Sequence, residues 1–182
     1  MKPALFVRLA FFAGFAAAFA RAERLDDAAA QTKVDACIAQ VRQWAAEPTI
    51  VSAVAAHNAT VPAEHLAMTQ AAWTGLAELD PFVRGFTKNE AGVWLKNHRP
   101  EWVTEAFVSD AKGLKVAFLA KTTNWSHAGK PKHDVPMSGQ IWQGKIEIDE
   151  STRVQQLQVA VPILVDGKPI GSLVVGLSLL KI

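Results

Sequence analysis

The chain has 182 residues, half of them hydrophobic, and carries 19 basic and 17 acidic side chains. This length allows one domain with its own core, and the composition excludes a disordered chain. Without Lys2 and Arg8 the charges balance, and no Lys/Arg cluster alternates with aromatic residues, so nucleic acid is not an expected partner.

The first 22 residues have the layout of a secretory signal peptide. Lys2 and Arg8 give a positive start, residues 9–20 form an uncharged run rich in Phe and Ala, and cleavage is expected after Ala20 or Ala22. This run has 12 residues, whereas a membrane-spanning helix needs about 20. We therefore expect a periplasmic mature domain over residues 23–182, with an uncleaved anchor helix as the alternative.

The first half of the mature chain is predicted to be helical. Residues 23–46 contain no Pro or Gly, and apolar residues recur there at spacings near three and four, which is typical of one helical stripe. Pro48 ends this helix, and shorter helices are predicted at about 49–57, 63–79 and 89–97. Cys37 is the single cysteine and excludes an intrachain disulfide; we expect it to be buried, with a reactive or intermolecular thiol as the alternative.

From residue 101 the apolar period changes from about 3.6 to 2, which predicts strands. The expected strands are at about 102–108, 114–118, 144–149, 156–163 and 170–180. Asp110 and Asp166 begin tight turns, where Asp is favoured for its local hydrogen bonds. All connections but residues 121–139 are short, so sequential antiparallel pairing is the economical topology. Helices followed by an antiparallel sheet predict an α+β domain.

Several segments, taken in order, resemble the PDC/Cache family of extracellular, PAS-like sensor proteins. The N-terminal region of that family resembles EPTIVSAV (47–54) and HNA (57–59), and its first hairpin looks like residues 103–116 with the turn SDAKGL (109–114). The segment after this hairpin is similar to KTTNW (121–125). The closing hairpin is matched best, by DES (149–151), VAVPI (159–163) and DGKPIGSLVVG (166–176).

The resemblance implies a long N-terminal helix and short helices on one face of a five-stranded antiparallel sheet. It implies a small-molecule pocket on the other face, roofed by the long loop. Cache-like domains often pair through their long helix, so a homodimer is one expectation, and packing of that helix on the sheet is the alternative explanation of its apolar stripe. Cache domains usually form the sensing half of kinases or chemoreceptors. No output module follows here, so we expect a membrane receptor or kinase to act as a partner in trans. The chain has no Tyr, so Tyr-lined amine recognition is not carried over.

The long loop 121–139 is the best candidate for a ligand site, since loops of this length in compact domains are usually binding lids or disordered segments. It carries Trp125, His127 and Lys130, and Trp142 follows it. An aromatic ring beside a cation suits a small anion or carboxylate, by stacking and charge-assisted hydrogen bonds. The alternative is a solvated lid whose Trp packs on the sheet.

Other residues receive a functional or a structural interpretation from their position. Trp102 at the first strand and Asp149 after the third are the further candidates for the pocket. Core packing is expected for Trp44, Trp73 and Trp94, and surface or capping roles are expected for His57, His65 and His98. His127, His133 and Asp134 have no recognised metal-ligand spacing. The chain has no nucleophile elbow, P-loop or zinc motif, so we expect neither a cofactor nor an enzyme.

Two functions remain open at this point. The first is a periplasmic small-molecule sensor domain that presents its ligand to a partner in trans. The second is a structural or adaptor protein that uses the fold as a protein-binding scaffold, with the pocket filled by its own side chains. A cavity lined by Trp125, Trp142 and a charged residue would favour the first, and aromatic residues packed into a closed core would favour the second.

Overall fold

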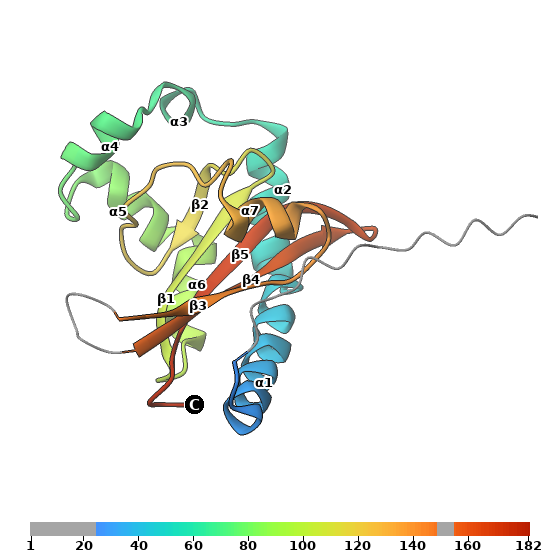
Figure 1. Ribbon diagram of the computed structural model, residues 1–182. Coiled ribbons are helices and arrows are strands. Elements are labelled where there is room, and N and C mark those ends of the chain that lie inside the picture. The colour runs from blue at the N-terminus through green and yellow to red at the C-terminus, as the bar shows by residue number, and fades with distance from the viewer. Residues whose placement is uncertain (1–24, 149–154) are drawn as a thin grey trace, which may run out of the picture.

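The computed structural model describes residues 25–148 and 155–182, and in them the chain forms seven helices and one five-stranded antiparallel sheet (Figure 1). The helices are α1 (Ala28–Ala45), α2 (Pro48–Ala59), α3 (Ala63–Ala67), α4 (Gln70–Gly75), α5 (Pro81–Lys88), α6 (Glu90–His98) and α7 (Pro131–Met137). The strands are β1 (Val103–Asp110), β2 (Lys115–Phe118), β3 (Trp142–Ile148), β4 (Gln155–Val165) and β5 (Lys168–Ser178). The predicted α+β class is confirmed.

The strands lie in the order β2-β1-β5-β4-β3, so the first and last strands of the chain are neighbours at the centre. The sequential pairing expected for β2 and β3 is therefore wrong, since these two strands form opposite edges of the sheet. The cause is the long connection 119–141, which crosses one face of the sheet instead of closing a hairpin. The closing hairpin is as predicted, and Asp166 and Gly167 at its turn have φ of 49° and 74°, the left-handed pair of a type I′ turn.

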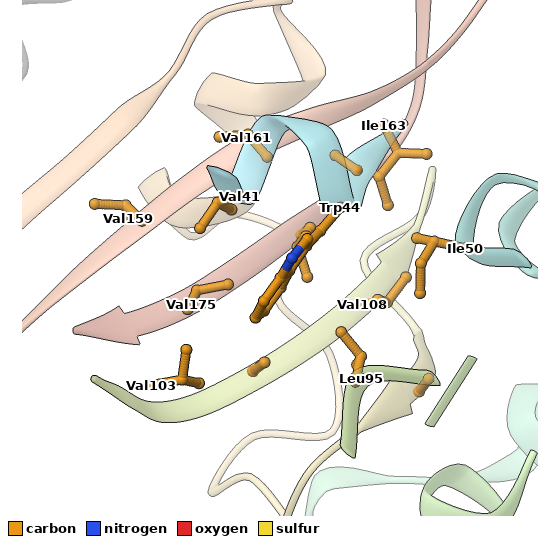
Figure 2. Close-up of a cluster of buried hydrophobic side chains, with 14 of the residues drawn as sticks. Val41, Trp44, Ile50, Leu95, Val103, Val108, Val159, Val161, Ile163 and Val175 are labelled. Atoms are coloured by element: carbon orange, nitrogen blue, oxygen red, sulfur yellow. The ribbon is translucent and has the colours of Figure 1, made fainter. Parts of the chain in front are cut away.

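One face of the sheet is covered by α1 and α2 and forms the larger apolar core. Alternate residues of β5 (Leu173, Val175 and Leu177) and of β4 point to this face, as the period of two requires. Figure 2 shows Trp44 of α1 among the valines of β1, β4 and β5. Its indole stacks on Trp102, with ring centroids 6.1 Å apart. Trp44 therefore takes the packing role expected of it.

The other face of the sheet is covered by α7 and the loop that carries it. Helix α7 lies across β4 and β5 (Figure 1). A second, aromatic cluster fills the end of this layer near β2, and its buried members are Trp73, Val83, Phe86, Phe107, Phe118, Trp125, Ala160 and Val174. The sheet thus lies between two layers of different chemistry, and the second layer is the one that contains the long loop.

Three helical segments differ from the sequence prediction. The predicted helix 63–79 is divided into α3 and α4 because Met68 is extended, with φ −67° and ψ 123°. Helix α5 was not predicted, although Asp80 caps it by accepting from the backbone of Phe82 and Pro81 occupies its first turn. Helix α7 lies within the predicted loop and also begins at a proline, Pro131.

The predicted signal peptide lies outside the described residues. Among residues 25–148 and 155–182, no helix combines the length and the apolar character that a bilayer crossing requires.

Candidate functional site

The face of the sheet under α7 buries an unusual number of polar side chains. Ser109 of β1, Lys115 of β2 and Ser172 of β5 are completely buried there. His127 of the long loop contacts Lys115, and His133 of α7 contacts Ser172. Burying polar groups costs free energy unless each finds a partner. The partners of each group therefore indicate what this face can bind.

The loop is held against the hairpin of β1 and β2 by backbone contacts. The amide of His127 donates to the carbonyl of Gly113 at 2.9 Å, and Ser126 forms an antiparallel bridge with Leu114. Gly113 has φ +79°, and a Cβ at this position would lie 2.4 Å from the backbone nitrogen of Ala128. Only glycine allows both this turn and this close approach. The contact brings His127 next to Lys115.

Lys115 is the most unusual residue of this face, with none of its surface exposed. Its Nζ is hydrogen-bonded to Nδ1 of His127 and lies 4.1 Å from the centroid of the Phe107 ring. Among the described residues, no carboxylate forms an ion pair with Lys115. Burial, followed by the charge of Lys132, holds the pKa of Lys115 well below its ordinary value, against the opposing charge of Glu105.

His127 is buried and neutral under ordinary conditions. Its ring stacks on Phe107 with centroids 4.5 Å apart. Burial, then the cations Lys115 and Lys132, lower the pKa of His127 from 6.5 to about 3. A neutral ring whose Nδ1 accepts from Lys115 carries its proton on Nε2. The imidazole thus serves as an acceptor for the buried amine.

A second lysine approaches the same aromatic ring from α7. Nζ of Lys132 lies 5.8 Å from the centroid of Phe107 and donates to Oε1 of Gln158 at 2.7 Å. The amide of Gln158 in turn donates to the carboxylate of Glu105. Burial lowers the pKa of Lys132, while Glu105 acts in the opposite direction. Glu105 is thus connected to Lys132 through an amide.

The two serines lie on the adjacent strands β1 and β5. Ser109 and Ser172 are paired residues of β1 and β5, and Ser109 also pairs with Lys115 of β2. The hydroxyl of Ser172 is bonded to Nδ1 of His133 at 2.8 Å. The hydroxyl of Ser109 is buried and has no hydrogen-bond partner among the described residues. A buried hydroxyl without a partner beside a buried amine is suited to an acceptor that the chain itself does not supply.

The structure brings together only part of the predicted set. His127 lies at the centre of the polar group, and Trp142, half-buried at the start of β3, packs against the aromatic cluster. Trp125 is buried inside that cluster, with Trp73, Phe82, Phe86 and His65 around its ring.

The remaining predicted residues lie elsewhere. Lys130 is exposed at the N-terminal end of α7, two residues before Lys132. Trp102 stacks on Trp44 at the opposite face of the sheet, so it does not meet the others. Asp149 lies outside the described residues.

The surface or capping role expected of His57 is wrong, and His65 is half-buried beside it. His57 is buried, with Nδ1 3.0 Å from Oδ2 of Asp110 and Nε2 2.7 Å from Nδ1 of His65. Asp110 keeps the expected turn role, since it accepts from the backbone of Lys112 and Leu114. His98 is exposed at the end of α6, as expected. The contact between α2, α3 and the end of β1 brings these side chains together, and no local sequence signal indicates it.

Lys115 was also missed, because a lysine between apolar strand residues is most simply read as facing solvent. Its burial depends on the loop that crosses this face, 12 residues further along the chain at His127. In the part of the chain that the structure describes, no three His, Cys, Asp or Glu side chains are arranged to hold a metal ion.

Comparison with known proteins gives structural neighbours only, since no family model and no curated protein matches the chain. The ligand-binding domain of the Pseudomonas aeruginosa amino acid chemoreceptor PctC, in complex with GABA, is similar with 13% identity and a TM-score of 0.38, covering 60% of this chain and 48% of its own. The sensor domain of the Vibrio cholerae histidine kinase DctB has 15% identity and a TM-score of 0.32, covering 82% and 57%. The sensory domain of the Campylobacter jejuni chemoreceptor Tlp3, with isoleucine bound, has 16% identity and a TM-score of 0.39, covering 85% and 64%.

These neighbours are ligand-binding or sensor domains of chemoreceptors and a histidine kinase. This chain spans about half to two thirds of their length, between 48% and 64%. The binding of GABA and of isoleucine is reported for those two neighbours and is not a statement about this chain.

Proposed function

We propose that the protein is an exported sensor domain that binds a small anion, most simply a carboxylate, between the sheet and α7. The observation that carries this proposal is the buried amine of Lys115, which has no ion pair within the described residues and lies beside the unpartnered hydroxyl of Ser109. A ligand carboxylate would supply the acceptor for both groups. Lys132 above the same Phe107 ring would provide the second cation.

Binding in this arrangement changes the charge of the site. Burial disfavours the ammonium form of Lys115 in the free protein, whereas an anion nearby favours it. A bound anion would therefore raise the pKa of Lys115 back towards its ordinary value, and the ion pair would be neutral overall. The loop holding His127 and Lys132 is the element that would close on the ligand and alter the surface seen by a partner. That partner is proposed to be a membrane receptor or kinase acting in trans.

A protein-binding scaffold is the second candidate function, and one observation favours it. Trp125, expected to contact a ligand, is buried among the rings of Trp73, Phe82 and Phe86. Side chains of the protein itself thus occupy the aromatic end of this layer. The polar end, around Lys115, is where the two functions make different predictions.

The test is thermal unfolding of the purified protein with acetate, pyruvate, succinate and the amino acids. A ligand at 100 times its dissociation constant adds about 2.7 kcal/mol of stability, which raises the unfolding midpoint by several degrees. We expect Lys132→Gln to lose this shift. Lys130→Gln, two residues away and exposed, is the matched control and should keep it. If no carboxylate raises the midpoint, the anion site is rejected and the scaffold function is favoured.

A further inference from the structure

A groove lies between helices α2, α3, α5 and α6. It has a volume of about 780 Å³, which is within the range of small-molecule sites. Its apolar lining includes Phe82 and Phe86 of α5 and Val116 of β2. His57 of α2 and His65 of α3 also line it. The polar group around Lys115 and Lys132 does not contribute to this groove.

The two histidines are connected to a buried carboxylate in a fixed order. Asp110 is completely buried and lies 3.0 Å from Nδ1 of His57, and Nε2 of His57 lies 2.7 Å from Nδ1 of His65. Burial alone would raise the pKa of Asp110, but hydrogen bonds from His57 and from the backbone of Leu114 and Lys112 lower it, so the carboxylate is ionised. His57 consequently donates from Nδ1 to Asp110.

The proton positions then follow along the chain of rings. When His57 is neutral, its proton lies on Nδ1 and its Nε2 accepts, so that His65 donates from Nδ1. A neutral His65 is thereby left with a lone pair at Nε2, which has no hydrogen-bond partner among the described residues. Burial, followed by the charge of His57, lowers the pKa of His65 and favours this neutral form. His65 therefore offers an acceptor from within the lining of the groove.

The charges of the lining have one sign. Glu64 of α3 and Glu90 of α6 contribute carboxylates, and the lining contains no Lys or Arg. The aromatic rings of Phe82, Phe86 and His65 lie against one another, with centroids 5.0 to 5.4 Å apart. Aromatic faces, carboxylates and an imidazole acceptor together attract a cation that has hydrogen-bond donors. The same groups repel an anion.

We propose that this groove is a second binding site, specific for a primary ammonium group attached to an apolar body. The ammonium donates to Nε2 of His65 and is flanked by Glu64 and Glu90, while the apolar body packs on Phe82 and Phe86. This site is independent of the anion site under α7, because the two share no lining residue.

Isothermal titration of the full chain with three matched probes tests the proposal. Benzylamine has the charge and the donors, benzyltrimethylammonium has the charge alone, and benzyl alcohol has no charge. We expect benzylamine to bind about tenfold or more tightly than either analogue, because a hydrogen bond to a charged group is lost in each. Equal affinity for all three probes, or no binding of benzylamine, would overturn the proposal.

Two variants locate the binding to this groove. Glu64→Gln removes a carboxylate that is exposed at the groove and is not needed for packing, and His65→Phe keeps the ring but removes the acceptor. We expect each to weaken benzylamine binding by about fivefold or more. Glu78→Gln, an exposed carboxylate outside the lining, is the matched control for the first and should have no effect.

The same titration separates the two sites. Benzylamine binding should be unchanged in Lys132→Gln, the variant that tests the anion site. If Lys132→Gln abolishes it, the amine binds under α7 and the second site is rejected. Failure of every carboxylate to bind would leave the amine result unaffected.

Discussion

The two faces of the sheet are built from alternate residues of the same strands, yet they differ in chemistry. In β5, Leu173, Val175 and Leu177 enter the apolar core under α1 and α2, whereas Ser172, Val174 and Gly176 face α7. The first face has the larger apolar core, with the buried pair of Asp110 and His57 at its edge, whereas the second combines an aromatic cluster with buried Lys115, His127 and two serines.

This difference indicates a division of tasks, in which the α1 face stabilises the fold and the α7 face binds. Apolar burial contributes about 25 cal/mol for each Å² removed from water, so the α1 face supplies most of the stability. Buried polar groups with incomplete pairing cost stability and are retained mainly at sites of function. The α7 face should therefore tolerate substitutions that the α1 face does not, and should lose binding when it is made more apolar. Three predictions test this comparison.

The largest effect is expected at Trp44 on the α1 face. Its ring is buried against Trp94 and Trp102, with centroids 5.8 and 6.1 Å away. Trp44→Ala should lower the free energy of unfolding by about 3–5 kcal/mol, because it removes the ring and leaves a cavity. Urea denaturation measures the change.

Trp142→Ala provides the matched comparison on the α7 face. Trp142 is half-buried at the edge strand β3, so its truncation should cost clearly less than that of Trp44. Equal losses for the two variants would mean that both faces contribute equally to stability, and the division of tasks would be wrong.

The sequence predicted the apolar face better than the polar one, for a physical reason. Periodicity reports which residues of one element share a face, and it correctly indicated the long first helix and all five strands. It does not report which strands become neighbours after a long connection, so the central pairing of β1 with β5 was not found. Asp80 and Pro81 follow the predicted helix 63–79, whereas in the structure they begin α5.

The candidate site depends on contacts between distant parts of the chain. Lys115 is buried only because the loop returns over it with His127, and His57 is buried only because α2 packs beside Asp110. Neither contact leaves a local pattern in the sequence. The length of the loop 121–139 is the one sequence signal for this site, since the loop contains both His127 and Lys132.

The second prediction concerns the pH dependence of stability. The pKa of His127 falls from 6.5 to about 3 on folding, so between these values the unfolded chain binds a proton that the folded protein does not. Stability from this group is complete above pH 6.5 and is lost as the pH falls below it. The loss should reach about 2 kcal/mol at pH 5.

The variant His127→Asn tests this assignment, because the Asn oxygen can still accept from Lys115 but does not titrate. Its free energy of unfolding should decline less steeply between pH 6.5 and 5 than that of the wild type. His65 and His133 also have lowered pKa values and leave part of the slope in place. His98→Asn, at an exposed position, is the control and should keep the full slope. An unchanged slope in His127→Asn would show that His127 is already protonated in the folded protein.

The smallest effect on stability is expected at Lys115, and its sign is the sharpest test of the comparison. Lys115→Met keeps the length of the side chain and removes the cost of burying an amine without an ion pair, while it leaves Nδ1 of His127 without a donor. The net result should be a gain of about 1 kcal/mol, together with the loss of any stabilisation by carboxylates. Lys112→Met, at an exposed turn position of the same hairpin, should change neither.

If Lys115→Met instead destabilises the protein as much as Trp44→Ala does, the buried amine is a structural element of this face. Anion binding at Lys115 would then lose the observation that supports it.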